Sequence, residues 1–215
     1  MEIGPGRGAL TRHLLARAGR VVAIEMDEAL ANHLRERFRG EAHLTVVHGD
    51  VLATDLLQWG PAVVAGNLPY YITSPIVRRT LEMGAGLIRA VFLVQKEVGL
   101  RLTANPGSRD YGLLTVLTRL YSEPELLFPV QASAFSPPPK VESVAVRLTP
   151  KPGALPAPDF AEFLGLCFRQ KRKTLRNNLI GVYPTGLIDS LPERSRRAEQ
   201  LTLEEFQEIH RKLRA

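Results

Sequence analysis

The stretch Gly66-Asn67-Leu68-Pro69-Tyr70-Tyr71 directly follows the short apolar run Ala62-Val63-Val64-Ala65. A bounded apolar run of this length is typical of a buried strand in a parallel sheet. The amide, the proline and the aromatic residues then fall at the carboxyl end of that strand, which is where open α/β sheets bind their ligands. The stretch therefore predicts both an α/β fold and the position of a binding site within it.

The side chains of this stretch suit a planar substrate that carries an exocyclic amine. Asn67 offers an acceptor oxygen and an amide donor, and Tyr70 offers a flat face on which a ring can stack. Pro69 stiffens the turn and biases Leu68 towards an extended conformation. The alternative is a strand-ending turn with a structural asparagine, so the motif needs support from the rest of the chain.

A glycine-rich segment, Met1-Glu-Ile-Gly-Pro-Gly-Arg-Gly8, opens the sequence, with Gly4, Gly6 and Gly8 alternating. Glycines allow a tight turn and a close approach of the backbone to a ligand. A helix is expected over residues 9–18, and a glycine-rich turn leading into a helix favours a nucleotide-like cofactor. The spacing departs from the strict G-x-G-x-x-G pattern, which makes this signal weak by itself.

Carboxylates follow the next two predicted strands. Glu25 lies 17 residues after the last of these glycines, a spacing that suits acceptance of hydrogen bonds from ribose hydroxyls. Asp50 can accept from an exocyclic amine such as that of adenine, or it can serve as a turn residue. Because Gly4, Glu25, Asp50 and Asn67 all fall at carboxyl ends of successive predicted strands, we expect them to form one site.

The remainder of the first 150 residues alternates predicted helices and strands. Between the last two strands lies Phe135-Ser-Pro-Pro-Pro-Lys-Val-Glu-Ser143, in which consecutive prolines enforce an extended path. That path can hold Phe135 out towards the site, and the alternative is a stiff connector with a core phenylalanine. The predicted elements are a helix over 28–38 capped by Asp27, a helix from a Ser74 cap to 83, strands over 90–94, 125–128 and 143–148, and helices over 95–104 and 113–119.

A proline-rich segment over residues 150–158 marks a boundary, so we predict domains over 1–150 and 151–215. The apolar residues from Phe160 to Leu179 follow helical spacing, which predicts one long helix capped by Asp159, with Cys167 on its core face. The box Thr202-Leu-Glu-Glu205 predicts the start of a last helix. Within the long helix, the run from Arg169 to Arg176 carries five cations and no acid, a pattern that suits phosphate contacts or a plain solvated face: Arg169, Lys171, Arg172, Lys173 and Arg176.

Composition bounds the partners and the compartment. The 215 residues carry a net charge of +6, which fits a polyanionic partner, and the single cysteine excludes an internal disulfide. The five histidines show no metal-ligand spacing, so no metal is expected. No apolar run reaches the ~18 residues of a membrane helix, and no signal peptide precedes the glycines, so we expect a cytoplasmic protein without a membrane partner.

In combination, these motifs resemble those of the ribosomal RNA adenine dimethyltransferases, and among them the small-subunit (KsgA-type) enzymes. The tail adds to the likeness, because residues 168–179 and 197–206 are similar to that group's C-terminal signatures. The resemblance covers nearly the whole chain and rests on the following stretches in order: Glu2–Gly8, Glu25, Asp50, Asn67–Tyr70 and Phe135–Ser143.

The resemblance implies a Rossmann-like class I methyltransferase sheet of seven strands with a small all-helical C-terminal domain that contacts RNA. It implies S-adenosylmethionine as cofactor and, as substrate, N6 of two adjacent adenosines in a 16S rRNA hairpin of the immature 30S subunit, with the protein acting as a monomer. The site residues that it implies fall in three groups: Gly4, Gly6, Glu25, Met26, Asp50, Val51 and Asn67 for the cofactor, Asn67, Leu68, Tyr70 and Phe135 for catalysis, and the five tail cations for RNA.

The expected chemistry agrees with these residue types. The lone pair of adenine N6 is delocalised into the ring, so acceptors at Asn67 Oδ1 and the Leu68 carbonyl can hold its hydrogens and favour a pyramidal nitrogen. The remaining contribution to catalysis is the alignment of this nitrogen with the methyl group of the cofactor. A stacked base cannot reach such a site, so the target has to be splayed out between aromatic rings.

Three alternatives remain open: a large-subunit (23S) adenine methyltransferase, a non-catalytic ribosome-assembly factor that binds RNA, and a DNA amine methyltransferase. The last is disfavoured by Asn-Leu-Pro-Tyr in place of Asp/Asn-Pro-Pro-Tyr. The family also carries a segment before the glycines, with a Gln-Asn-Phe-Leu-type motif. This sequence begins within the first predicted strand, so we expect its cofactor pocket to lack one wall.

Overall fold

The computed structural model describes residues 1–135, 138–153 and 158–214 and divides the chain into two compact units. The first unit is formed by Met1–Gly99 and Ser122–Pro152, and the second by Leu100–Tyr121 and Gly153–Ala215. The predicted boundary at 150/151 lies two residues before the break between the units. Residues 154–157 of the predicted linker lie outside the described residues.

The predicted boundary places the segment Leu100–Tyr121 in the first domain, whereas the structure groups it with the C-terminal residues. Tyr111 and Val116 are buried in the same apolar cluster as Phe163 and Phe206. Helical periodicity shows that this segment has an apolar face, but not which core that face enters.

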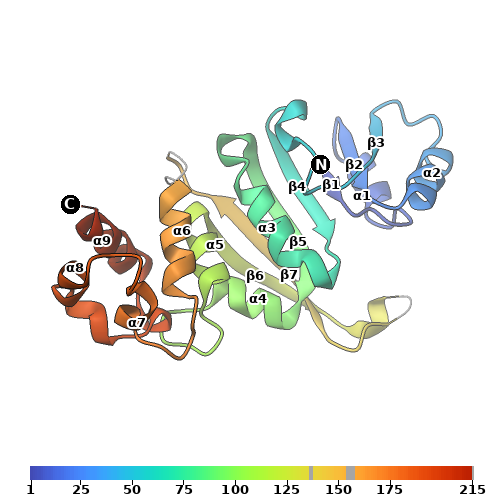
Figure 1. Ribbon diagram of the computed structural model, residues 1–215. Coiled ribbons are helices and arrows are strands. Elements are labelled where there is room, and N and C mark those ends of the chain that lie inside the picture. Colours follow the sequence, from blue (N-terminus) through green and yellow to red (C-terminus); the bar gives the residue numbers. More distant parts are fainter. Residues whose placement is uncertain (136–137, 154–157, 215) are drawn as a thin grey trace. The chain divides into compact units, whose positions relative to one another are not determined.

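The first unit contains a seven-stranded sheet with the strand order β3-β2-β1-β4-β5-β7-β6 (Figure 1). The five strands from β3 to β5 are parallel, and β7 runs antiparallel to both β5 and β6. This is the predicted α/β fold, and all the predicted strands are present. Their bounds are β1 Glu2–Ile3, β2 Val21–Glu25, β3 Leu44–His48, β4 Ala62–Asn67, β5 Leu87–Gln95, β6 Ser122–Val130 and β7 Ser143–Pro150.

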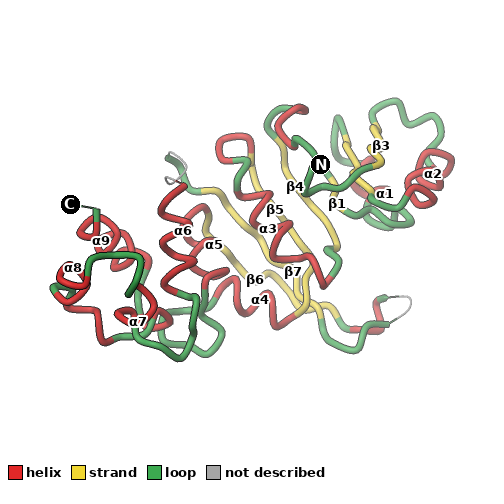
Figure 2. The backbone as a smooth tube through the Cα atoms, viewed as in Figure 1, coloured by secondary structure: helices red, strands yellow, loops and turns green. Residues whose placement is uncertain are grey.

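Helices connect the parallel strands, as Figure 2 shows in red beside the yellow strands. Helix α1 contacts β2, α2 contacts β2 and β3, and α3 contacts β5. Every residue of β2 is buried, which explains why its sequence is apolar until the strand ends at Glu25. The helix bounds are α1 Thr11–Leu15, α2 Glu28–Arg37, α3 Thr73–Leu81 and α4 Lys96–Thr103.

One of the two predicted helix caps in this unit is confirmed and the other is wrong. The side chain of Asp27 accepts a hydrogen bond from the Leu30 amide at 3.0 Å and so caps α2. Helix α3 begins at Thr73, so Ser74 lies inside it and does not cap it. The Thr73 hydroxyl instead donates to the carbonyl of Pro69 at 3.1 Å, which ties the helix to the Asn-Leu-Pro-Tyr turn.

The second unit is helical around an apolar cluster that includes Phe163, Leu175 and Phe206. The predicted single helix over 159–179 is wrong, because the chain leaves helix after Cys167 and re-enters it at Leu175. The Asn178 side chain accounts for the break: its amide nitrogen donates to the carbonyls of Cys167 and Gln170 at 2.8 and 3.2 Å. The helices are α5 Leu113–Tyr121, α6 Pro158–Cys167, α7 Leu175–Leu179, α8 Thr185–Asp189 and α9 Leu203–Leu213.

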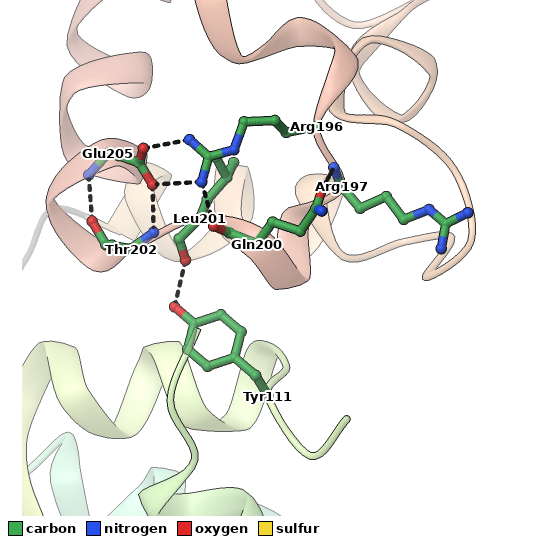
Figure 3. Close-up of polar contacts among 7 residues, drawn as sticks. All are labelled: Tyr111, Arg196, Arg197, Gln200, Leu201, Thr202 and Glu205. Atoms are coloured by element: carbon green, nitrogen blue, oxygen red, sulfur yellow. Dashed lines mark hydrogen bonds and ion pairs between the residues drawn. The ribbon is translucent and has the colours of Figure 1, made fainter. Parts of the chain in front are cut away.

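Polar contacts join segments of this unit that are distant in sequence (Figure 3). The predicted capping box is confirmed, since Thr202 and Glu205 exchange hydrogen bonds between side chain and backbone. The Tyr111 hydroxyl donates to the Leu201 carbonyl at 2.7 Å. Burial raises the pKa of Tyr111 to about 12, so the phenol stays protonated and keeps donating at neutral pH.

Within the part of the chain that the structure describes, no helix is both long and apolar enough to span a bilayer.

Candidate active site

A cavity of about 340 Å³ opens at the carboxyl ends of the parallel strands in the first unit. Its floor is apolar and includes Ile3, Ile24 and Ile76, and its polar groups come from strand ends. Among the residues predicted for the cofactor, the cavity brings together these five: Gly4, Glu25, Met26, Asp50 and Val51.

The carboxylate of Glu25 is held by two backbone amides. Its Oε1 accepts from the Asp27 amide and its Oε2 from the Gly6 amide, each at 3.0 Å. Glu25 is only 7% exposed, so the carboxylate is fixed in the cavity wall. Because each carboxylate oxygen has two acceptor positions, each oxygen retains one for a ligand hydroxyl.

Gly6 acts on the site indirectly. It is not among the described residues that line the cavity, yet its amide holds Glu25. Its φ of +56° lies in the left-handed region that favours glycine. The alternation of glycines in the sequence thus has a definite geometric reason here: the loop turns back and presents an amide to the carboxylate.

Asp50 serves as a turn residue, one of the two roles considered for it, and also lines the cavity. Its Oδ1 accepts from the Leu52 amide at 2.9 Å, which closes a turn, and its carbonyl accepts from the Thr54 hydroxyl at 2.7 Å. The guanidinium of Arg79 donates to the Thr54 carbonyl at 3.0 Å. These contacts fix the loop so that Asp50 lines the cavity beside Val51.

A close approach of β1 and β4 positions the Asn-Leu-Pro-Tyr turn next to the glycine loop. A Cβ atom at Gly66 would lie 2.5 Å from the Ile3 carbonyl oxygen, so only glycine fits at this position without a backbone shift. Directly after β1, a Cβ at Gly4 would lie 3.9 Å from the carbonyl oxygen of Asn67. Asn67 therefore lies beside the first cavity, although it does not line it.

A second cavity of about 260 Å³ is lined by Asn67, Leu68, Pro69, Tyr70, Phe135 and Pro139. It contains all four residues predicted for catalysis. It shares Pro69 with the first cavity. The structure thus divides the single expected site into two adjoining cavities, because Pro69 turns the chain between them.

Hydrogen bonds to β5 and β7 hold two residues that line the second cavity. The Leu68 amide donates to the Leu93 carbonyl at 3.0 Å, and the Leu68 side chain is buried in the core. The Tyr70 hydroxyl forms a 3.0 Å hydrogen bond with the Ser143 hydroxyl. Phe135 is half-buried, while Ser136 and Pro137 of the predicted rigid segment lie outside the described residues.

Several residues of these cavities were not predicted. Tyr71 lines the first cavity from the turn before α3, and Ile76 lines it from α3. At these positions the sequence shows only a second aromatic residue and an ordinary helical apolar position. Glu2 lines neither cavity, but it is 2% exposed, and its carboxylate accepts from the Thr11 hydroxyl at 2.6 Å. Burial raises the pKa of Glu2. A glutamate inside a strand gave no signal of this buried contact.

The predicted RNA-binding cations lie in the second unit: four on the connection between α6 and α7, and the fifth, Arg176, on α7. Arg169 and Lys171 donate to the carbonyls of Asn178 and Arg109, and Arg176 forms an ion pair with Asp189. Arg172 and Lys173 are exposed, and no ion pair joins either of them to another described residue. The charges of these two exposed cations are therefore neither neutralised by a carboxylate nor held by a carbonyl within the described part of the chain, and both can face a polyanion.

Residues 1–135, 138–153 and 158–214 contain no group of three or more His, Cys, Asp or Glu side chains arranged to hold a metal ion. Cys167 is fully buried in the apolar cluster, as predicted. Burial raises the pKa of its thiol, which keeps the sulfur protonated and unreactive.

Parallel strands that end in a glycine loop and two carboxylates, beside a cavity with an amide and aromatic residues, are typical of α/β enzymes with a nucleotide-like cofactor. The family model for ribosomal RNA adenine dimethylase matches residues 1–213. The chain therefore belongs to the ribosomal RNA adenine dimethylase family, as its motifs predicted.

Relatives and solved structures agree with this assignment. The chain is 43% identical to the ribosomal RNA small subunit methyltransferase A of Acidobacterium capsulatum, over 99% of this chain and 80% of that protein. It is 42% identical to the protein of the same name from Myxococcus xanthus, with the same two coverages.

Two solved structures share the complete fold. A dimethyladenosine transferase from Plasmodium falciparum matches with a TM-score of 0.83 and 28% identity, over 98% of this chain and 89% of that chain. The 23S rRNA methyltransferase ErmE matches with a TM-score of 0.73 and 30% identity, over 100% of this chain and 90% of that chain.

Proposed function

We propose that this protein transfers methyl groups from S-adenosylmethionine to N6 of two adjacent adenosines in a hairpin of small-subunit rRNA. The observation that carries the proposal is the pair of adjoining cavities, one with a fixed carboxylate and one lined by an amide and two aromatic residues, which share Pro69. Family membership supports the reaction class, and the two cavities supply a place for each of the two reactants.

The residues of the first cavity fit the cofactor. Glu25 is the acceptor for the two ribose hydroxyls, because each of its oxygens keeps one free acceptor position while a backbone amide occupies the other. Asp50 accepts from the cofactor's adenine amine, and Gly4 allows the methionine portion to approach the backbone. When bound, S-adenosylmethionine supplies an electrophilic methyl group.

The residues of the second cavity fit a flipped-out adenine. The Asn67 Oδ1 atom and the Leu68 carbonyl accept the two N6 hydrogens, which favours a pyramidal nitrogen with its lone pair available. Tyr70 and Phe135 stack on the two faces of the base. No general base is needed, because the proton can leave after transfer, and the remaining contribution is alignment.

The second unit provides the electrostatic part of RNA binding. Arg172 and Lys173 are exposed cations on the connection between α6 and α7, where a phosphate backbone can approach without first breaking an ion pair. A small-subunit substrate is favoured over a large-subunit substrate, because the two bacterial relatives at 42–43% identity are small-subunit enzymes, whereas ErmE is 30% identical.

Methyl transfer to under-methylated ribosomal subunits tests the proposal. Purified protein is incubated with labelled S-adenosylmethionine and with small or large subunits from cells that lack the modification, and the labelled nucleosides are identified after digestion. We expect N6,N6-dimethyladenosine in the small-subunit RNA. Label in the large subunit would support the 23S alternative, and binding without transfer would support a non-catalytic assembly factor.

A further inference from the structure

The hydroxyl groups of Tyr70 and Ser143 form a hydrogen bond of 3.0 Å between residues that are 73 positions apart in sequence. Tyr70 lines the second cavity, and Ser143 is not one of the lining residues. The hydrogen bond therefore fastens the far end of the Tyr70 ring to a group behind the cavity wall.

Ser143 is a rigid anchor. It is 0% exposed and is the first residue of β7, where it pairs with Gln95 of β5 on one side and with Val130 of β6 on the other. The preceding residue is also fixed, because the carbonyl of Glu142 accepts from the Lys96 amide at 2.9 Å. A serine hydroxyl in this position has little freedom to move away from its partner.

Tyr70 has no comparable support from its own segment. It begins the single turn Tyr70–Ile72, which has no side-chain cap, and its ring is only half-buried. The two ends of the β6–β7 connection are Val130 and Ser143, which are paired with each other, and Phe135 lies on that connection. The hydrogen bond thus ties the Tyr70 ring to the strand pair whose connection carries Phe135, the other aromatic residue of the cavity.

We propose that Ser143 is a positioning residue that sets the plane of the Tyr70 ring against Phe135, so that the second cavity accepts one flat base between two rings. This inference rests on the proposed function, since it assumes that the cavity receives an adenine. It assigns a role to a fully buried side chain that touches neither reactant.

The test uses four variants of the full chain. Tyr70→Phe keeps the ring but removes its hydroxyl, Ser143→Ala removes the partner, and the double variant removes both. Ser122→Ala is the matched control, because Ser122 is also a fully buried serine and lies at the opposite end of the β6–β7 pairing, where it pairs with Pro150.

Base stacking is measured directly with an RNA hairpin that carries 2-aminopurine in place of the target adenine, because stacking on an aromatic ring quenches its fluorescence. This readout does not depend on methyl transfer. We expect strong quenching with the wild type and with Ser122→Ala, and clearly weaker quenching with Tyr70→Phe and Ser143→Ala at saturating protein. Equal quenching by all variants, or none by the wild type, would overturn the proposal.

Single-turnover methylation provides the second readout. Loss of one neutral hydrogen bond predicts a fall in the transfer rate of about 3- to 10-fold in each single variant, with no further fall in the double variant. The affinity for S-adenosylhomocysteine and the KM for RNA should not change. Additive losses, or a parallel loss of cofactor affinity, would mean that Ser143 is a general structural residue. Absence of transfer in the wild type, with quenching intact, would instead count against the proposed function alone.

Discussion

Replacing Glu25 by glutamine should weaken cofactor binding by about one to two orders of magnitude. In the structure, the Asp27 and Gly6 amides each donate to one carboxylate oxygen at 3.0 Å. Glutamine keeps one acceptor oxygen and turns the other position into an NH₂ group, which cannot accept from a backbone amide. One of the two amides then loses its partner, and the acceptor left for the ribose is uncharged.

The magnitude follows from the ribose hydrogen bond that the glutamine variant cannot form. A hydrogen bond to a charged group contributes about 1.5–3 kcal/mol, and about 1.4 kcal/mol corresponds to a tenfold change in affinity. Loss of one ribose hydrogen bond of this kind predicts about 10- to 100-fold weaker binding. The orphaned backbone amide should also lower the free energy of unfolding of the ligand-free protein by about 1–3 kcal/mol.

Titration calorimetry with S-adenosylhomocysteine measures the affinity, and urea unfolding measures the stability. Glu28→Gln is the matched control, since Glu28 is an exposed carboxylate three residues further along the chain and does not line the cavity. The control should bind like the wild type. If Glu25→Gln binds S-adenosylhomocysteine within twofold of the wild type while remaining folded, the ribose role of Glu25 is refuted.

Three further predictions concern other parts of the chain. Burial raises the pKa of Glu2, so the stability that its protonated form contributes is present below the unfolded pKa and is lost as the pH rises through the folded pKa. Replacing Glu2 by glutamine should therefore increase the free energy of unfolding, relative to the wild type, more at pH 7 than at pH 4. An equal change at both pH values would contradict this. Replacing Arg172 and Lys173 together by glutamine should lower the salt slope of RNA binding by about 2, or about 1 per phosphate contact, whereas the same change at Arg211 and Lys212, which are paired with Glu208, should leave the slope unchanged. Tyr111→Phe should lower the free energy of unfolding by about 1–3 kcal/mol, because the buried Leu201 carbonyl loses its donor. The control is Tyr71→Phe, since Tyr71 is exposed. If both variants lower the free energy of unfolding equally, water replaces the phenol hydroxyl.

The sequence predicted the parallel part of the sheet and its strand-end residues well, because both depend on local patterns. Apolar runs ending in Glu25, Asp50 and Asn67 mark where strands stop, and parallel strands necessarily stop at one edge of the sheet. The second cavity was predictable for the same reason, since Asn67, Leu68 and Tyr70 are neighbours in sequence.

Features that depend on distant partners could not be predicted in this way. The apolar spacing from Phe160 to Leu179 is helical throughout, yet the helix breaks where the Asn178 amide takes over the carbonyls of Cys167 and Gln170. Residues 100–121 belong to the second unit because Tyr111 and Val116 pack into its apolar cluster. Their own sequence does not show which apolar core they join. The partnership of Tyr70 with Ser143 is likewise invisible without the β5–β7 register.

The most direct test of the central claim, that cofactor and base occupy two adjoining cavities, is the effect of Asn67→Ala on two quantities measured on the same preparation. Asn67 lines only the second of the two cavities, so the single-turnover rate of methyl transfer should fall by about 100-fold or more while the affinity for S-adenosylhomocysteine stays within about threefold of the wild type. Equal losses in the transfer rate and in cofactor affinity would contradict the division of the site at Pro69.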